Sequence, residues 1–476
     1  MKCYNDAFFA QAVFFRMKST NSLLPAEKRS VSILASLYAM RMLGLFMVLP
    51  VFMVEGQSLQ GANPTLLGLA IGVYGLSQAV LQIPFGILSD KLGRKKMIFI
   101  GLVLFALGSV VAASSSSIYG VIVGRVLQGA GAIASVLMAL LSDLTREENR
   151  TKAMATVGMT IGLSFAVALV LGPILTASFG LSGVFWVTAG LAVVGMLLLT
   201  RVPQAVQSKR HLETQVVTGS LSSVFGNKEL MRLNWGIFSL HLVMTALFVA
   251  IPISLLNQFG FEKAQHGYFY LAVIFGAFVS MVPLIIIGEK RRQIRRFFQG
   301  AVLLLTVALL AEIWGMTGFI SFTLLLFCFF VAFNYLEATL PSLVSKVAPA
   351  GMRGTAMGVY SSSQFLGAFL GGTLGGVAYD MGGLAAVYGL CATIGLVWTI
   401  LTMSMPEPPY TTSLVLPLRP FEHGSAEQVS QQLGNIPGVQ DVTLVVEEHL
   451  AYLKIDRKCL DEEALYKHPL AARAEG

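Results

Sequence analysis

Residues 65–96 read TLLGLAIGVYGLSQAVLQIPFGILSDKLGRKK. Residues 65–88 are almost all apolar or small, and residues 90–96 form a segment rich in Lys and Arg. An α-helix rises about 1.5 Å per residue, so roughly twenty apolar residues cross a hydrocarbon core about 30 Å thick. The stretch therefore predicts a membrane-spanning helix that ends in a short basic loop.

The same pattern recurs along the chain. Hydrophobic residues make up 55% of the 476 residues and charged residues 12%, about half the charged share of a soluble domain. Apolar runs fall near residues 30–54, 65–88, 97–114, 118–142, 153–177, 183–200, 233–256, 267–288, 297–314, 319–345, 355–378 and 384–404. Lipid offers no partner for backbone groups, and the runs are too long for barrel strands, so we predict twelve α-helices.

Positive charge predicts the orientation of the loops. The net charge is +8, and on one side the loops contain Lys91, Arg94, Lys95, Lys96, Arg146, Arg150, Lys152, Lys290, Arg291, Arg292, Arg295, Arg296, Lys346 and Arg353. The loops on the other side have Lys263 as their one Lys or Arg residue. These loops lie near 55–64, 114–117, 178–182, 257–266, 315–318 and 379–383. This asymmetry indicates a multi-pass protein of a bacterial inner membrane with both termini in the cytoplasm, and it disfavours a nucleic-acid partner.

The cysteines and the N-terminal residues indicate neither a disulfide or metal site nor a signal peptide. Cys3, Cys328, Cys391 and Cys459 lie far apart without metal-ligand spacing, so we expect neither a disulfide framework nor a metal. The apolar residues 8–15 are too few to span and lack a cleavage pattern, so we expect no signal peptide and consider Met17 an alternative start.

The polar interruption at residues 201–232 divides the predicted helices six and six. We therefore predict an N-terminal cytoplasmic segment (1–29), a six-helix bundle (30–200), a cytoplasmic linker (201–232), a second bundle (233–405) and a soluble domain (410–476). Basic loops at 86–96 and 288–297 follow the second and eighth helices, which indicates an internal repeat. Paired bundles of this kind are typical of secondary transporters.

The C-terminal segment has a different composition. Residues 406–476 hold eleven acidic and six basic side chains and no spanning run. The pattern predicts strands at 413–418, 442–446 and 450–455, a helix at 425–436 and a further helical segment from Asp461, in the order of a ferredoxin-like unit. Residues 438–456 resemble heavy-metal-associated domains without their paired cysteines, so we expect a docking or regulatory role, or self-association through a free strand edge.

The loop GILSDKLGRKK (86–96) is the most specific motif. It resembles the signature loop between helices 2 and 3 of the major facilitator superfamily, with Gly86, Asp90, Gly93, Arg94 and Lys95 in the matching places. The resemblance implies a fold of two six-helix bundles and a conformational latch in which Arg94 binds Asp143, at the end of helix 4. The alternative is a solvated basic loop that only sets topology.

Helices 4 and 5 carry two weaker motifs. GRVLQGAGAIA (124–134) resembles the second family motif, and its Arg125 either binds carbonyls of a facing helix or tunes a nearby acid for proton coupling. Gly172 and Pro173 resemble an antiporter motif, although Thr176 and Ala177 replace its later glycines. A Gly-Pro kink permitted by close helix packing is the simpler alternative. Gly367, Gly371 and Gly375, on helix 11, predict a packing face.

Helix 1, LYAMRMLGLFMVLPVF (37–52), is similar to that of the twelve-helix drug:proton antiporters. Deeply placed ionisable residues are Arg41, Arg125, Glu337 and the weaker His241, and all four lie on helices that line the central cavity in this superfamily. A carboxyl in a partly dry cavity exchanges protons at working pH, so Glu337 is the predicted proton site. The alternative for Glu337 is a fixed ion pair with Arg41. The alternative for His241 is a packing role without proton exchange. Glu55 and Glu312 lie near helix ends, within reach of water.

Candidate substrate contacts are polar or aromatic residues of the cavity and gate helices. They are Tyr74, Gln78, Gln82, Asn234, Asn334, Tyr335 and Gln364. A mixed lining suits apolar or weakly polar molecules, although many such residues serve only as interhelical contacts.

Together these features predict a proton-coupled transporter that exports small amphipathic compounds by alternating access. A uniporter or importer of a small metabolite, possible for an anion because of Arg41 and Arg125, is the alternative within transport, and a membrane sensor that signals through residues 410–476 is the alternative outside it. No phosphate-binding loop for ATP and no catalytic constellation are present, so we expect neither an enzyme nor a cofactor. The sequence leaves the substrate open.

Overall fold

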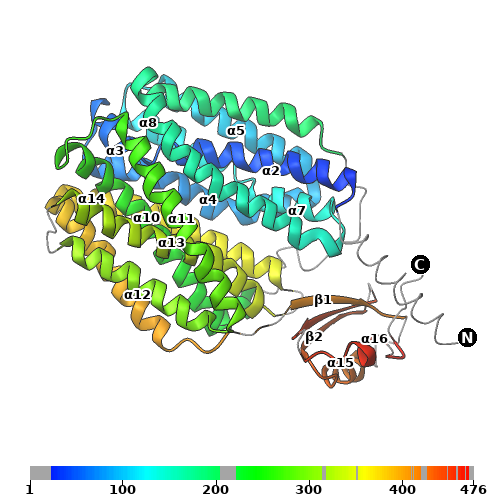
Figure 1. The fold of residues 1–476 in the computed structure, drawn as a ribbon. Helices are drawn as coiled ribbons and strands as arrows, with labels where there is room; N and C mark the ends of the chain where they lie inside the picture. The colour runs from blue at the N-terminus through cyan, green and yellow to red at the C-terminus, as the bar shows by residue number, and fades with distance from the viewer. Residues whose placement is uncertain are drawn as a thin grey trace, which may run out of the picture. The chain divides into compact units, whose positions relative to one another are not determined.

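The computed structural model describes residues 23–203, 221–313, 318–349, 352–408, 410, 412–419, 426–446, 449–456, 459–466 and 468–470. The alternative start at Met17 and most of the predicted linker lie outside these residues. Helices dominate the described chain (Figure 1). They are α2 (Pro25–Phe46), α3 (Phe52–Glu55), η1 (Gly56–Ser58), α4 (Pro64–Leu92), α5 (Arg94–Ser114), α6 (Ile118–Ala130), α7 (Ala134–Asp143), α8 (Glu147–Thr200), α9 (Leu221–Gly226), α10 (Lys228–Asn257), α11 (Gln265–Lys290), α12 (Ile294–Ile313), α13 (Phe319–Val347) and α14 (Arg353–Met403).

Within the described residues, nine helices are long and apolar enough to cross a membrane. Two of them each contain two predicted apolar runs. The runs at 153–177 and 183–200 lie on either side of Gly180 in α8, where φ is 65° and ψ is −174°. The runs at 355–378 and 384–404 lie on either side of Gly382 and Gly383 in α14, where φ of Gly383 is 61°. Glycine adopts positive φ without steric cost, so the chain turns at these two points.

Two runs predicted as single helices are interrupted. The run at 30–54 is divided between α2 and α3 by turns at residues 47–51, next to Pro50, which has no backbone N–H to donate. The run at 118–142 is divided between α6 and α7 at residues 131–133. Here Gly131 contacts the carbonyl oxygen of Gly101 on α5. Glycine has low helix propensity, and this approach leaves no room for a side chain.

The chain forms two compact units, and unit 1 comprises Met1–Lys209, Thr245–Ala272 and Phe369–Val387. In this unit the backbones of α4 and α14 touch. A Cβ atom on Gly68 would collide with the carbonyl oxygen of Gly372, and one on Gly72 would collide with that of Phe369. Small residues thus replace side-chain packing at this contact, as in other membrane helix pairs.

Unit 2 comprises Arg210–Met244, Val273–Ala368 and Tyr388–Gly476. Gly367 of α14 lies against the backbone of Phe238 on α10, so its predicted packing role agrees with its surroundings. Gly375, further along α14, lies against Ala246 within unit 1. Trp398 is fully buried and packs edge-on against Phe298 of α12, with ring centroids 6.2 Å apart.

The C-terminal region of unit 2 contains a three-stranded antiparallel sheet. Its elements are β1 (Thr412–Pro417), α15 (Ala426–Gly434), β2 (Val439–Val445), β3 (Leu450–Ile455) and α16 (Glu462–Tyr466). The strand order is β1-β3-β2, with Leu414 opposite Leu453 and Val442 opposite Leu453. Leu416, Leu433, Leu453 and Ile455 form a core with α15 and α16. The elements match the strands and helices predicted from alternation of apolar residues.

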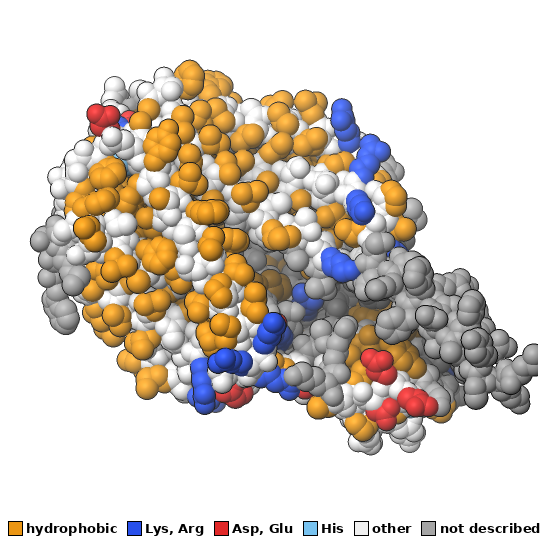
Figure 2. Space-filling view, in the orientation of Figure 1, with side chains coloured by type: hydrophobic (Ala, Val, Ile, Leu, Met, Phe, Trp, Pro, Cys, Tyr) orange, Lys and Arg blue, Asp and Glu red, His pale blue; other side chains and the backbone are white. Residues whose placement is uncertain are grey.

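The surface of the helices is apolar, as a lipid environment requires. Large exposed residues include Leu163, Phe275, Ile320 and Ile400, each between 65% and 81% exposed. Figure 2 shows hydrophobic side chains spread over the visible face of the helices, while Lys and Arg gather near helix ends. This distribution is the reverse of a water-soluble helical protein.

The α4–α14 contact predicts a sharp difference between two glycine variants. Gly68→Ala places a Cβ atom against the backbone of Gly372 and Gly376, so we expect it to destabilise the protein by about 1–3 kcal/mol. Gly389→Ala meets open space and is expected to be neutral or to stabilise α14 by up to about 1 kcal/mol. Thermal unfolding in detergent measures both. Equal effects of the two substitutions would contradict the close contact.

Candidate functional site

Three helices of unit 2 bring Glu337, Gln364 and His241 together. Glu337 lies on α13, Gln364 on α14 and His241 on α10. The Gln364 amide nitrogen is 3.2 Å from Glu337 Oε1 and 2.8 Å from His241 Nε2, and His241 Nδ1 is 3.8 Å from Glu337 Oε2. The amide has two hydrogens, so it can donate one to the carboxylate and one to a neutral imidazole.

Glu337 is partly accessible to solvent, although its Oε2 atom is buried and has no hydrogen-bond partner among the described residues. Its side chain is 35% exposed, whereas that of His241 is 10% exposed. The rest of the site is aromatic, with Phe333 beside the His241 ring at a centroid distance of 6.2 Å and buried Tyr360 within electrostatic range of Glu337. Tyr360 was not predicted from the sequence, although it precedes Gln364 by four residues and so shares its helix face.

Arg125 of α6 is completely buried, and each of its three guanidinium nitrogens donates a hydrogen bond. Its Nε donates to the carbonyl of Ala70 at 3.2 Å, Nη2 to that of Ile71 at 3.4 Å, and Nη1 to Gln128 Oε1 at 3.0 Å. Its guanidinium also lies 4.9 Å from the ring centroid of Tyr74. These contacts match the first of the two alternatives for Arg125, an arginine that ties α6 to carbonyls of the facing α4.

Arg41 of α2 has a different environment. It is 2% exposed, and none of its three guanidinium nitrogens has a hydrogen-bond partner among the described residues. It lines a narrow, mostly apolar crevice together with Leu102 and Phe105 of α5 and Leu191 of α8. A buried guanidinium without an acceptor is costly, so this position calls for an anion, a carbonyl or water.

The other predicted substrate residues are dispersed. In unit 1, Gln78 donates to the Tyr74 hydroxyl at 3.4 Å, and Gln82 is buried. In unit 2, Tyr335 is 2% exposed, and Asn234 and Asn334 each retain a buried amide atom that has no hydrogen-bond partner within the part of the chain that the structure describes. Among these residues only Gln364 joins the cluster around Glu337.

The loop between α4 and α5 surrounds Arg94 with acceptors. The Arg94 guanidinium lies 2.6 Å from Asp90, 2.6 Å from the Ser89 hydroxyl and 3.3 Å from Asp143 at the end of α7. Gly93, between the two helices, has φ 97°, a conformation that side chains oppose. A Cβ on Gly86 would approach only the Ser135 hydroxyl.

Lys95 ties the same loop to the end of α8, because its Nζ donates to the Val202 carbonyl at 2.6 Å. The predicted helix 5 motif lies elsewhere in unit 1. Gly172 contacts the backbone of Met47, and Thr176 donates to the carbonyls of Gly172 and Pro173. The surroundings of Gly172 and Pro173 are thus those of a tightly packed kink.

A second group of charges at these helix ends was missed from the sequence. Glu27, ahead of the first apolar run, accepts from the Leu24 and Arg146 backbone N–H groups and from the Arg146 guanidinium and the Asn149 amide at 2.8–3.3 Å. Burial alone would raise the pKa of Glu27, but the hydrogen bonds from Arg146 and Leu24 outweigh it, and the pKa falls to about 2. Only Glu27's position three residues after Leu24 offers a sequence signal, a helix-start glutamate.

Comparison with known proteins agrees with this architecture. The family model described as Major Facilitator Superfamily matches residues 31–372. The chain belongs to the major facilitator superfamily. It is therefore a multi-pass membrane transporter and not an enzyme.

Individual relatives place it more closely. The chain is 47% identical over 92% of its length to the inner membrane transport protein YajR of Escherichia coli, of which it covers 96%. It is 27% identical to the multidrug resistance protein MdtH of Aeromonas salmonicida, over 71% of this chain and 84% of that one. The crystal structure of a D-xylose-proton symporter matches with a TM-score of 0.65 at 17% identity, over 79% of this transporter and all but 2% of that chain.

Glu27 predicts a pH-dependent stability. Its pKa is lowered from an ordinary value of 4.5, so its contribution is complete above about pH 4.5 and is lost as the pH falls toward 2. Glu27→Gln should lower stability at pH 7 by about 1.5–3 kcal/mol, and the difference from wild type should shrink below pH 4.5.

Thermal unfolding in detergent as a function of pH measures this effect. Glu229→Gln is the matched control, because its ion pair with Arg232 is partly exposed, with the Glu229 side chain at 34%, and stabilises little. A difference for Glu27→Gln that stays constant from pH 7 to pH 3 would contradict the assigned contacts.

Proposed function

We propose that the protein is a proton-coupled exporter of small amphipathic compounds. In this account it has twelve membrane-spanning helices in two six-helix halves, resides in the inner membrane with both termini in the cytoplasm, and carries a ferredoxin-like C-terminal domain that lacks the fourth strand. The cluster of Glu337, Gln364 and His241 carries the proposal. It joins three helices of the second half around one carboxyl, on a side chain that is 35% exposed.

The cluster offers a direct coupling chemistry. A protonated Glu337 is neutral and can remain in a partly dry site, whereas the ionised form needs donors, and Gln364 supplies one. His241 accepts from the same amide, so a change of charge at Glu337 is felt on α10, α13 and α14 together. A substrate that binds beside Glu337 and displaces its proton would shift the packing of these three helices.

Contacts within unit 1 support alternating access. On the side opposite the basic loops, Glu55 pairs with Lys263 at 2.8 Å and Thr65 donates to Asp380 at 3.0 Å. These pairs join the first-half segments to residues 245–272 and 369–387 of the second half. We infer that they form an outer gate, closed here over glycine contacts and opened when the substrate leaves.

The loop around Arg94 fits the role of an inner latch. One guanidinium binds Asp90 of its own turn and Asp143 of α7, so it ties the end of α4 to the end of α7. Its partly buried position strengthens these bonds relative to fully exposed ones. We propose that Gly86, Asp90, Gly93, Arg94, Lys95 and Asp143 hold the first half rigid while the halves rock.

Substrate class is proposed from the aromatic surroundings of the cluster and from the distant multidrug relatives. Phe333 and Tyr360 beside Glu337 suit an apolar body with a basic or polar group. The multidrug resistance protein MdtH shares the family architecture at 27% identity. These two observations together support the proposal that the protein exports amphipathic molecules.

The proposal predicts substrate-linked proton release. Purified protein in weakly buffered detergent solution should release protons when an amphipathic cation is added from a panel that includes ethidium and benzalkonium. Glu337→Gln cannot ionise and should abolish the release. Glu312→Gln is the matched control, because Glu312 lies near the far end of α12 and should leave the release unchanged.

Proton release is followed with a pH indicator dye. Release that persists in Glu337→Gln would place coupling elsewhere, and binding of a compound to wild type without any release would exclude proton coupling for that compound.

Import or uniport of a small organic anion is the second candidate. The observation that favours it is the buried guanidinium of Arg41, which has no hydrogen-bond acceptor among the described residues. Small carboxylates such as benzoate should then raise the thermal stability of the wild type and not of Arg41→Met. Equal stabilisation of both proteins would remove this candidate.

A further inference from the structure

The two halves carry equivalent loops with different turns. In the first half Gly93 stands between α4 and α5 with φ 97°, and in the second half Arg292 stands between α11 and α12 with φ 51°. The left-handed region is disfavoured for residues other than glycine. Glycine would adopt this conformation at lower cost. The presence of arginine therefore indicates that the Arg292 side chain makes a stabilising or functional contact.

The Arg292 side chain binds the C-terminal region. Its Nη2 lies 3.1 Å from Oδ1 and 3.3 Å from Oδ2 of Asp456, which follows β3 directly. Its guanidinium also lies 5.0 Å from the ring centroid of Tyr410, on the segment that leads from α14 to β1. The Tyr410 hydroxyl in turn accepts from the Ile294 backbone N–H, at the start of α12. The Asp456 side chain is 13% exposed and that of Arg292 is 37% exposed, so the carboxylate is largely buried while the guanidinium is partly open to water.

Comparison of the halves explains why this carboxylate comes from outside the bundle. The first half has Ser142 and Asp143 at the end of α7, and Asp143 binds Arg94. The matching segment of the second half has Ser345 and Lys346 at the end of α13. Lys346 cannot accept from an arginine, and it pairs instead with Glu289 at 3.1 Å. The second half therefore lacks the acidic residue that the first loop uses.

The sheet contacts the same helix end a second time. Lys454 of β3 donates from Nζ to the Lys346 carbonyl at 2.5 Å. Tyr452 and Lys454 face away from the core of the C-terminal region, because alternate residues of β3 fill that core, yet both are less than 8% exposed. The second face of the sheet is thus covered.

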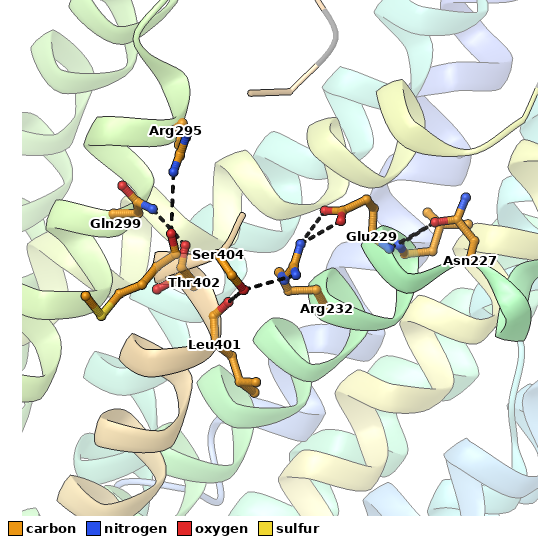
Figure 3. Close-up of polar contacts among 10 residues, drawn as sticks. Asn227, Glu229, Arg232, Arg295, Gln299, Leu401, Thr402 and Ser404 are labelled. Atoms are coloured by element: carbon orange, nitrogen blue, oxygen red, sulfur yellow. Dashed lines mark hydrogen bonds and ion pairs between the residues drawn. The ribbon is translucent and has the colours of Figure 1, made fainter. Parts of the chain in front are cut away.

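Side chains also fix the point where the chain leaves the bundle. Figure 3 shows Arg295 and Gln299 of α12 directed at the last turn of α14 and Arg232 of α10 at Ser404. Gln299 donates to the Thr402 carbonyl at 2.7 Å, Arg295 to the Met403 carbonyl at 3.4 Å, and Arg232 to the Ser404 hydroxyl at 3.2 Å. Carbonyls at a helix end lack intrahelical partners, so these donors stabilise the end that carries the C-terminal region.

We propose that the C-terminal region is a built-in latch of the second half: Asp456 supplies to Arg292 the carboxylate that Asp143 supplies to Arg94 in the first half. The docking surface is formed by Arg292, Ile294, Lys346 and Tyr410, and its occupant is the β3 end of the same chain. The docking is independent of proton coupling at Glu337. Its bonds are ionic and near the surface, so rising ionic strength weakens them.

Electron spin resonance tests the proposal on the full-length protein in detergent. Spin labels on Glu427→Cys of α15 and Gly300→Cys of α12, with the four native cysteines replaced by serine, report the separation of the C-terminal region from the bundle. The docked protein should give one narrow distance population. Arg292→Glu or Asp456→Arg should replace it with a broad one, and the double variant should recover the narrow population.

Two controls separate docking from folding. Arg291→Glu makes the same charge change at an exposed neighbour and should leave the narrow population intact. Arg292→Gly removes the side chain and relieves the positive φ, so it should lose docking without lowering the thermal stability of the bundle. A narrow population that persists in both Arg292 variants would overturn the proposal, as would a double variant no narrower than either single one.

Discussion

Hydrocarbon supplies no hydrogen bonds, so each charge within these helices depends on a partner that the chain itself places. Arg125 shows one solution, because carbonyls of α4 and the amide of Gln128 accept a hydrogen bond from each of its three guanidinium nitrogens and so tie α6 to α4. Glu337 shows another, because it shares one amide with His241 and keeps a third of its side chain open. The first arrangement is static, whereas the second can accept two states of charge. We therefore propose that function resides at Glu337, where hydrogen bonding to the charged group is incomplete.

The same constraint organises the helix ends, where water competes for each charge. Arg94 gathers acceptors from its own turn and from α7, and Glu27 gathers donors from the start of α8. Both groups lie in unit 1 and tie several helices of the first half into one body. In the second half a lysine occupies the matching helix end, and Arg292 instead binds Asp456 of the C-terminal region. Both halves thus have a basic loop after their second helix. They differ in which part of the chain supplies the carboxylate that binds the arginine of that loop.

Much of this architecture is legible in the sequence, because apolar length and loop charge are local properties. The helical fold followed from them, the strand and helix positions after residue 412 followed from the alternation of apolar residues, and the family was indicated by the resemblance of the motif at residues 86–96. The interruptions at residues 47–51 and 131–133 did not, since they depend on packing between helices far apart in the chain. For the same reason the sequence could place Glu337 and His241 on cavity-lining helices but not show that Gln364 joins them. Glu27 was missed because its partners Arg146 and Asn149 lie about 120 residues away, and its bond with the Leu24 N–H gives only a weak local signal.

The central claim is that Glu337 is the group that changes its protonation during transport. Infrared difference spectroscopy of the purified protein between acid and alkaline buffer detects the stretching band of a protonated carboxyl directly. The account predicts a protonated-carboxyl band that differs between the two buffers in the wild type and in Glu312→Gln and is absent from Glu337→Gln. An identical titrating band in wild type and Glu337→Gln would contradict the account and assign the exchanging proton to another residue.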